Sequence, residues 1–356
     1  MRTRWVLCAL PLAACVTTID EHASPIGEVV RDCVVPPPAG VVALDAPVSL
    51  EYPDRSLWLW EELPGADGTP RRGVGAWVAS LDEACAGPRL IADGAGAPAA
   101  VLALTPAEAA ANASRADGKR LALAPTGGVV HAGTGYLFYD LVERGPGPLD
   151  ATTLGTGLCA LAPDATACVR VADGAGATLL WAPTARVLDR GGVVIADADA
   201  AGGARAVIAG CRRVAAFDDP CVVSGAPVAA LADPAAYQVY SVFAGWVDAL
   251  TDATAFADAP GALTLAPYDG GYLATSMAIF DNRVDVHRSP RATDGFGRAI
   301  AAFDVVPPDA WWFVRGGREH AALRPTPRSI VVSYATDGAA APGLHLVAFR
   351  FFGDFQ

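Results

Sequence analysis

Recurrent Asp-Gly dipeptides between short runs of β-branched and aromatic residues constrain the fold of this chain more than any other feature. An Asp-Gly pair accommodates positive φ angles and is typical of tight turns between antiparallel strands. Such pairs begin at residues 67, 93, 117, 173, 269, 294 and 337. Helical signals are rare, and residues 105–112 carry the best one, with Thr105 as N-cap and Pro106 in the first turn. The sequence therefore predicts an all-β protein.

Pairs of predicted strands repeat along the chain. In each pair an aromatic or β-branched strand is followed, after a polar or glycine-rich turn, by a strand with alternating apolar residues. The pairs are 57–63 with 74–81, 136–141 with 157–161, 193–197 with 204–208, 272–280 with 284–289, and 330–334 with 344–349. Their second strands begin 83, 47, 80 and 60 residues apart. These intervals favour the blades of a β-propeller with unequal loops over a short solenoid repeat.

Several of these stretches resemble known five-bladed propellers. Residues 271–290 and 329–335, the latter continuing at 343–349, look like closing blades of family-43-like glycoside hydrolases and of the related DUF4185 domain family. Residues 46–60 look like the first blade of that family. The resemblance covers about residues 41–352 and implies an all-β, five-bladed β-propeller. A pair of β-sandwiches is the competing fold class.

The N-terminus carries the pattern of an export signal. Arg2 and Arg4 precede about ten apolar residues, which as a helix rise about 15 Å and cannot cross a hydrocarbon core of roughly 30 Å. Residues 12–15, Leu-Ala-Ala-Cys, resemble the lipobox of bacterial lipoproteins, which implies cleavage before Cys15 and lipidation of its sulfur. Val16 in place of Asp points, by analogy, to the outer membrane. An ordinary secretory signal with an incidental cysteine is the alternative.

We therefore expect a signal peptide at residues 1–14, a lipidated tether at 15–40 and a β-propeller domain at 41–356. The alternative for the tether is an arm that packs as a first strand, because Cys33 could pin it. No later run reaches the roughly 18 apolar residues of a second membrane helix, so the lipid is the only membrane anchor we expect. The predicted location is the cell envelope, facing the periplasm or the exterior.

The charge of the chain disfavours one class of partner. The chain has 26 basic and 38 acidic residues and a formal net charge of −12. Loss of residues 1–14 would remove two arginines and no acid, which makes the mature chain more negative. A nucleic acid is bound mainly through its phosphates and needs the opposite sign, so we expect no nucleic-acid partner.

The remaining cysteines predict disulfides. Without Cys8 and Cys15, an even number is left: Cys33, Cys85, Cys159, Cys168, Cys211 and Cys221. An even number in an exported protein favours disulfides, and the short spacings 159–168 and 211–221 suit two local bridges. That leaves Cys33 for Cys85, although six cysteines allow fifteen pairings. No CxxC spacing is present, and we expect no metal and no cofactor.

Polar residues that enter the predicted inner strands at the central channel are the site candidates. These are Asp45, His131, Asp189, Glu319 and His320. Related glycosidases use an aspartate base in the first blade, a second aspartate that tunes the pKa and a glutamate acid in a later blade. The resemblance therefore implies Asp45 as base or nucleophile and Glu319 as acid, since hydrolysis needs two opposed carboxyl groups. An aspartate that caps a turn is the alternative for Asp45.

The catalytic pattern of the relatives is incomplete in this chain. Residues 121–131, which approach the second blade, contain no acid, and Glu61-Glu62 stands where DUF4185 relatives tend to have Gly-Asp-Thr. His131, Asp189 and His320 are ligand-binding candidates, with a structural histidine as the alternative for His320. Trp58, Trp311 and Trp312 could stack on sugar rings, with core packing as the alternative for each.

These observations favour binding over catalysis. We expect an envelope-anchored propeller that binds a glycan or another envelope or extracellular ligand. A glycoside hydrolase is the first alternative and would need two carboxyl groups facing each other at about 5 to 9.5 Å. A protein-interaction scaffold is the second alternative, and it predicts a filled channel and an apolar surface patch.

Overall fold

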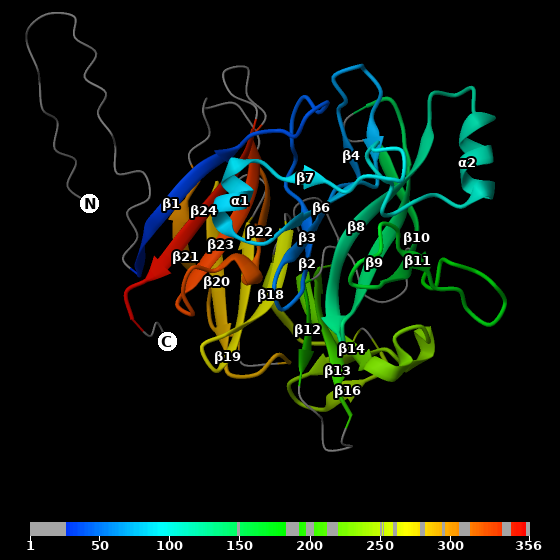
Figure 1. The fold of residues 1–356 in the computed structure, drawn as a ribbon. Helices are drawn as coiled ribbons and strands as arrows, with labels where there is room; N and C mark the ends of the chain where they lie inside the picture. Colours follow the sequence, from blue (N-terminus) through cyan, green and yellow to red (C-terminus); the bar gives the residue numbers. More distant parts are fainter. Residues whose placement is uncertain are drawn as a thin grey trace, which may run out of the picture.

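The computed structural model describes residues 26–147, 150–182, 192–196, 203–211, 220–249, 251, 253–258, 262–277, 282–293, 296–305, 314–336 and 343–353. Within these residues, five antiparallel sheets follow one another around a common axis (Figure 1). The α-helices of the described residues are α1 (Leu81–Ala86) and α2 (Pro106–Ala113). The protein is therefore a five-bladed β-propeller, as the strand pairs predict.

Blades 1 and 2 are consecutive in the chain. Blade 1 consists, from the axis outward, of β2 (Val48–Glu51), β3 (Ser56–Leu59), β6 (Gly75–Val78) and β7 (Arg89–Leu90). Between β3 and β6 the chain forms a small hairpin of β4 (Glu62–Leu63) and β5 (Arg71–Arg72). Blade 2 consists of β8 (Arg120–His131), β9 (Thr134–Arg144), β10 (Ala151–Leu161) and β11 (Val169–Arg170).

Blade 3 is the most elaborate of the five. It consists of β12 (Gly192–Ala196), β13 (Arg205–Cys211), β14 (Pro220–Pro227), β15 (Gln238–Ser241) and β16 (Gly245–Val247), and β17 (Ala255–Asp258) also pairs with β14. The 3-10 turns η1 (Val228–Ala230) and η2 (Pro234–Ala236) connect β14 to β15. Blade 4 is a plain meander of β18 (Ala262–Tyr268), β19 (Gly271–Met277), β20 (Arg283–Ser289) and β21 (Ile300–Asp304).

Blade 5 combines both ends of the chain. It consists of β22 (Val314–Glu319), β23 (Ser329–Thr336) and β24 (Gly343–Phe351), with β1 (Gly27–Val35) as its outermost strand. The 3-10 turn η4 (Ala321–Leu323) follows β22. In Figure 1 the blue β1 lies beside the red β24, and the two strands pair from Gly27↔Phe351 to Val35↔Leu344. Residues 27–35 of the expected tether are thus a strand that closes the ring, because β24 offers them a free edge.

The inner strands pack around the axis. Contacts join β2 to β8, β8 to β12, β12 to β18 and β18 to β22. All pairings within the blades are antiparallel, so successive inner strands run in the same direction along the axis. Residues that precede the inner strands therefore meet at one end of the channel, and residues that follow them meet at the other.

The hydrophobic core is divided into five clusters, one at each junction between neighbouring blades. Leu50 and Leu137 belong to the cluster between blades 1 and 2, and Trp58 and Leu346 to the cluster between blades 5 and 1. Because both faces of a blade are covered, the central strand β23 is buried at every position, and its polar residues are Ser329, Ser333 and Thr336. Each blade is therefore stable only between two neighbours.

The predicted elements are largely confirmed. The strand pairs β3–β6, β9–β10, β12–β13, β19–β20 and β23–β24 are the pairs read from the sequence. The pair β12–β13 occupies a different place in its blade. It consists of the innermost and second strands, whereas each of the other pairs consists of the second and third strands. Helix α2 begins with the predicted capping box of Thr105 and Glu108.

The three predicted disulfides are confirmed. Cys33 of β1 is bonded to Cys85 of α1, and the other bonds are Cys159–Cys168 and Cys211–Cys221. The first bond joins blade 5 to blade 1 across the closure of the ring, whereas the other two lie within single blades.

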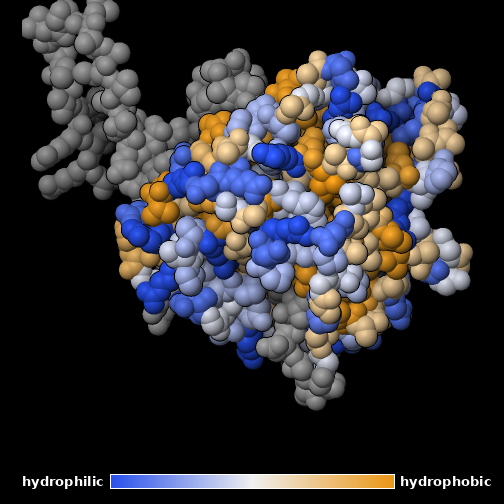
Figure 2. Space-filling view, in the orientation of Figure 1, coloured by the Kyte–Doolittle hydropathy of each residue, from blue (hydrophilic) through white to orange (hydrophobic). Residues whose placement is uncertain are grey.

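Figure 2 shows hydrophilic residues across the middle of the face turned to the viewer and hydrophobic residues beside them. Among the described helices, none is long and apolar enough to cross a membrane.

Loss of the Cys33–Cys85 bond should cost more stability than loss of Cys159–Cys168. The bonds close loops of 52 and 9 residues, and the loop-entropy model gives a difference of roughly 1.5 kcal/mol at 25 °C. The measurement is the free energy of unfolding of the variants C33S/C85S and C159S/C168S in urea. Equal losses would contradict this role of the closure bond.

Candidate functional site

The inner strands surround a small cavity in the central channel. Residues of β2, β8, β18 and β22 line it, and its volume is about 50 Å³. Ordinary ligand pockets have volumes of roughly 300 to 1,000 Å³, so this cavity has room for water but not for a sugar ring.

Two glycines of β22 shape one wall of the channel. Gly316 and Gly317 have φ angles of +99° and +78°, and the pairing with β23 shifts register between Gly316 and Arg318. A Cβ atom would lie 2.3 Å from Ala46 Cβ at Gly316 and 2.2 Å from Met277 Cβ at Gly317. Only glycine fits these two positions. The resulting bulge sets the direction of the polar side chains that follow it.

Glu319 is the first of two carboxyl groups that line the cavity. The residue is 4% exposed. Its Oε1 accepts hydrogen bonds from the Arg324 guanidinium, with Nε at 2.7 Å, and its Oε2 accepts one from Thr275 Oγ1 at 3.1 Å. Glu319 is therefore a buried charge whose oxygens are all engaged by fixed donors, as a buried carboxylate requires.

Glu51, at the end of β2, is the second carboxyl group of the cavity. Its Oε2 accepts a hydrogen bond from the Ala322 backbone N–H at 2.9 Å, and its Oε1 accepts one from Ser56 Oγ at 3.2 Å. Burial raises the pKa of Glu51, hydrogen bonds oppose this shift, and the charge of Glu319 raises the pKa further. Its side chain nevertheless keeps 27% of its surface exposed, toward the cavity that it lines.

His320 is a structural histidine, which was the alternative to a ligand role. Its ring is fully buried against Trp58, with Nδ1 3.0 Å from Ser49 Oγ and Nε2 2.8 Å from Ser333 Oγ. Each serine hydroxyl can donate or accept, so the two complement a neutral ring. Burial, with a smaller effect from Arg318, lowers the pKa of His320 to about 3.

Trp58 does not fit the sugar-stacking role predicted for it. It is fully buried, and its ring packs against Trp60 and His320. No face of the ring is open to a ligand, because blades 5 and 1 enclose it. Trp58 is therefore a core residue, as the alternative interpretation had it.

Asp45 lies at the other end of the inner strands. Its side chain is 45% exposed, its Oδ1 accepts a hydrogen bond from the Ala46 N–H at 2.8 Å, and its Oδ2 is 3.5 Å from Arg315 Nη1. Arg315 precedes Glu319 by four residues, roughly 10 Å along the bulged strand β22. The structure therefore does not bring Asp45 and Glu319 together, and the expectation of a facing catalytic pair is corrected.

Of the remaining site candidates, the structure describes only His131. His131 is the last residue of β8 and pairs with Thr134 across a tight turn, outside the lining of the channel cavity. Asp189, Trp311 and Trp312 lie outside the described residues, as does Cys15. Among the residues that the structure describes, no group of three or more His, Cys, Asp or Glu side chains could hold a metal ion.

Seven charged residues gather near the starts of the inner strands, and we call them the charged cluster. They are Asp45, Glu61, Glu62, Arg72, Arg120, Arg144 and Arg315. They come from the loop before β2, the segment after β3 with the β4–β5 hairpin, the start of β8, the end of β9 and the start of β22. Three blades, 5, 1 and 2, therefore contribute to one surface region.

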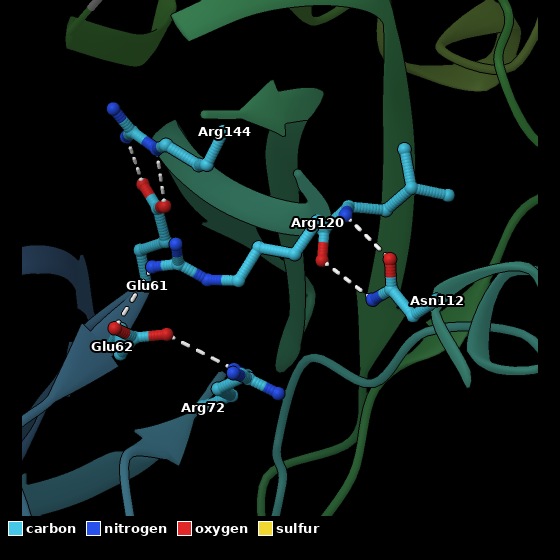
Figure 3. A network of polar contacts seen from close by, with 7 residues as sticks. Glu61, Glu62, Arg72, Asn112, Arg120 and Arg144 are labelled. Carbon is cyan, nitrogen blue, oxygen red and sulfur yellow. Dashed lines mark hydrogen bonds and ion pairs between the residues drawn. The ribbon is translucent and has the colours of Figure 1, made fainter. Parts of the chain in front are cut away.

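Figure 3 shows the part of the charged cluster between blades 1 and 2. Arg144 binds Glu61 through two parallel hydrogen bonds, Nε to Oε1 at 2.8 Å and Nη2 to Oε2 at 2.5 Å. Glu62 accepts from Arg120 Nη2 at 2.9 Å and from Arg72 Nε at 3.0 Å. Each of these guanidinium groups therefore already donates to one carboxylate, and only Arg144 does so through two hydrogen bonds.

Neighbouring contacts hold this network in place. The side chain of Asn112, on α2, both donates to and accepts from the backbone of Leu121, which fixes the start of β8 (Figure 3). The hydrogen bonds that Arg144 donates to Glu61 raise the pKa of Arg144, and the charge of Asp45 contributes to this shift. Asp45 therefore lies near both Arg144 and Arg315, and it connects Arg315 to the rest of the charged cluster.

Sequence reasoning missed Glu51 and the arginines of the charged cluster. The pair Glu61-Glu62 was noted only as a departure from the relatives. The sequence did contain a signal, because three of these arginines lie at or near strand ends. Arg120 and Arg315 lie at the starts of inner strands, and Arg144 ends the strand that pairs with β8. Only the ring geometry shows that these ends are neighbours.

The fold is shared with a solved structure of low sequence identity, and two further structures are reported for comparison. The chain is similar to a proposed hydrolase from Bacteroides ovatus ATCC 8483, with a TM-score of 0.56 and 13% identity over 88% of this chain and 86% of that one. It also matches Zg3597, a family 117 glycoside hydrolase from Zobellia galactanivorans, with a TM-score of 0.47 and 10% identity over 93% and 91% of the two chains. The GH43_1 enzyme from Xanthomonas citri gives a TM-score of 0.43 and 11% identity over 88% and 90%.

No protein-family model and no curated protein matches this chain. The likeness to the Bacteroides ovatus structure agrees with the propeller fold derived from the sheets and the interblade clusters.

His320 should make stability depend on pH in a defined window. Between about pH 3 and 6.5 the unfolded chain binds a proton on His320 that the native state does not, so stability falls as pH is lowered through this window. The change is His320→Gln, and the measurement is the free energy of unfolding at pH 7 and pH 4. We expect a smaller fall in the variant than in the wild type, and equal falls would contradict the neutral buried ring.

Proposed function

We propose that this protein binds a glycan at the charged cluster and does not hydrolyse it. One observation carries this proposal: Asp45, the acid expected to act as base, contacts Arg315 at the starts of the inner strands, whereas Glu319 is bound to Arg324 at their other end. Hydrolysis needs two carboxyl groups that face each other across a pocket. Binding needs only exposed donors and acceptors, and the charged cluster offers both.

The composition of the charged cluster supports recognition of a sugar. Its four arginine side chains are between 31% and 49% exposed, so each guanidinium is accessible to a ligand while it is held by a carboxylate. Charged groups fixed on three blades give a rigid arrangement, which lowers the entropic cost of binding. We also propose that the propeller is related to the family-43-like glycoside hydrolases and to the DUF4185 domain family.

The proposal includes the location of the protein. The Leu-Ala-Ala-Cys motif at residues 12–15 supports a lipid on Cys15 and attachment to the outer membrane. The disulfides support folding in an oxidising compartment. The propeller would then be held at the membrane surface through the chain that leads into β1.

Replacement of the lipidated cysteine should release the protein. In a cell that processes lipoproteins, we expect the wild type in the detergent-soluble membrane fraction and Cys15→Ser in the aqueous fraction, because the variant has no thiol to acylate. Cys8→Ser is the matched control and should stay with the membrane. An unchanged distribution of Cys15→Ser would remove the lipid anchor from the proposal.

Binding should be detectable on a panel of immobilised neutral and charged polysaccharides. We expect retention of the mature protein on at least one of them, and a loss of about tenfold in affinity for Arg144→Gln, since a charge-assisted bidentate contact contributes about that much. Arg31→Gln is the control, because Arg31 is 39% exposed and pairs with Asp82 away from the charged cluster. Retention on no polysaccharide would contradict the proposed function.

Hydrolysis is the second candidate function, and one observation favours it. Glu51 and Glu319 line the same cavity, and only one of them is tied to an arginine, an asymmetry that acid–base pairs of hydrolases share. The Bacteroides ovatus protein with this fold is described as a proposed hydrolase. Release of new reducing ends by the wild type, and its loss in both Glu51→Gln and Glu319→Gln, would replace binding by hydrolysis as the function.

A further inference from the structure

The charged cluster has a positive net charge, whereas the net charge of the whole chain is negative. Four arginines stand against three carboxylates, which leaves one positive charge, whereas the chain has a formal net charge of −12. A general excess of arginine does not explain this, because acidic residues outnumber basic ones by 38 to 26. The seven residues of the charged cluster therefore favour a ligand with negative charge more than the chain as a whole does.

The guanidinium groups of the charged cluster still have hydrogen-bonding capacity. A guanidinium has five N–H donors. Arg72 and Arg120 each donate one side-chain hydrogen bond, both to Glu62, and Arg120 Nε is buried without a partner among the described residues. The buried Arg120 Nε is out of reach of a ligand, whereas the remaining donors of the two partly exposed side chains are available to an incoming acceptor.

The network itself shows which acceptor these groups fit. Arg144 holds Glu61 in the parallel two-bond geometry that guanidinium forms with planar or tetrahedral oxyanions. Partly exposed ion pairs contribute little to folding stability, so a ligand oxyanion can share or replace such a partner at low cost. The acids of the charged cluster then serve to hold the arginines apart and in place.

We propose that the ligand of the charged cluster is a negatively charged polysaccharide, whose oxyanion groups are bound by Arg72, Arg120, Arg144 and Arg315. This inference rests on the proposed function and adds to it the chemical class of the glycan. The repeating charges of such a polymer match a cluster that extends over three blades. Carboxylate and sulfate share the required chemistry, and the two probe pairs below distinguish them.

The test compares charged polymers with neutral polymers of the same backbone. The probes are polygalacturonate against its full methyl ester, and dextran sulfate against dextran, with binding to the mature wild type measured by calorimetry. We expect at least about tenfold tighter binding of one charged polymer than of its neutral partner, and weaker binding as NaCl rises, because exposed charge interactions are screened. Tighter binding of polygalacturonate than of its methyl ester identifies carboxylate as the bound group. Tighter binding of dextran sulfate than of dextran identifies sulfate.

Variants then locate the site. The double variant R72Q/R120Q should lose about tenfold or more in affinity for the charged polymer, whereas Arg350→Gln should bind like the wild type. Arg350 is the matched control because it is 52% exposed and pairs with Glu28 at the ring closure. Unfolding curves identify a variant that has lost its fold, and the comparison of polymers on the wild type does not depend on any variant.

The outcomes separate this inference from the proposed function. Equal, salt-independent binding of a charged polymer and its neutral partner overturns the inference and leaves glycan binding intact. If the protein binds neither probe pair but is retained on a neutral polysaccharide of the panel, the inference is likewise overturned and glycan binding stands. No binding to any polysaccharide overturns both. Charge-dependent binding that R72Q/R120Q retains in full overturns the assignment to the charged cluster.

Discussion

The pairing of β1 with β24 is the interaction on which the rest of the structure depends. A propeller blade has two apolar faces, and each is covered only by the neighbouring blade, so a ring that stays open exposes two faces at once. Here the N-terminal strand completes the last blade, and the Cys33–Cys85 bond ties that strand to blade 1. The cluster between blades 5 and 1, which contains Trp58 and Leu346, is therefore formed by segments from opposite ends of the chain.

Closure of the ring also decides where ligand chemistry can occur. With five blades the inner strands come close to the axis, and glycines such as Gly316 and Gly317 are needed where one strand passes another. The cavity between β2, β8, β18 and β22 has a volume of about 50 Å³, and its carboxyl groups have fixed partners. Exposed charges gather instead at the starts of the inner strands, where the loops of three blades meet and water reaches the side chains.

Local patterns predicted the elements well and the site poorly. Each strand pair and the capping box around Thr105 depend on residues that are near in sequence, and the structure has them. Spacing favoured the three disulfides that the structure has, but it left the pairing of six cysteines open. The pair Asp45 and Glu319 failed because it assumed that both residues lie on the same side of the channel. One precedes β2 and the other ends β22, and strand direction around the ring puts them near opposite ends.

By itself, the sequence determined the all-β class, the five strand pairs and the short helix, because turn propensity and alternation act over a few residues. The tertiary structure alone decided that residues 27–35 close the ring, that His320 and Trp58 are core residues, and that Arg72, Arg120, Arg144 and Arg315 share one surface with Asp45. These facts depend on contacts between blades that are far apart in the chain. Such contacts follow from the closed geometry of the ring and leave no mark in the spacing of residues along it.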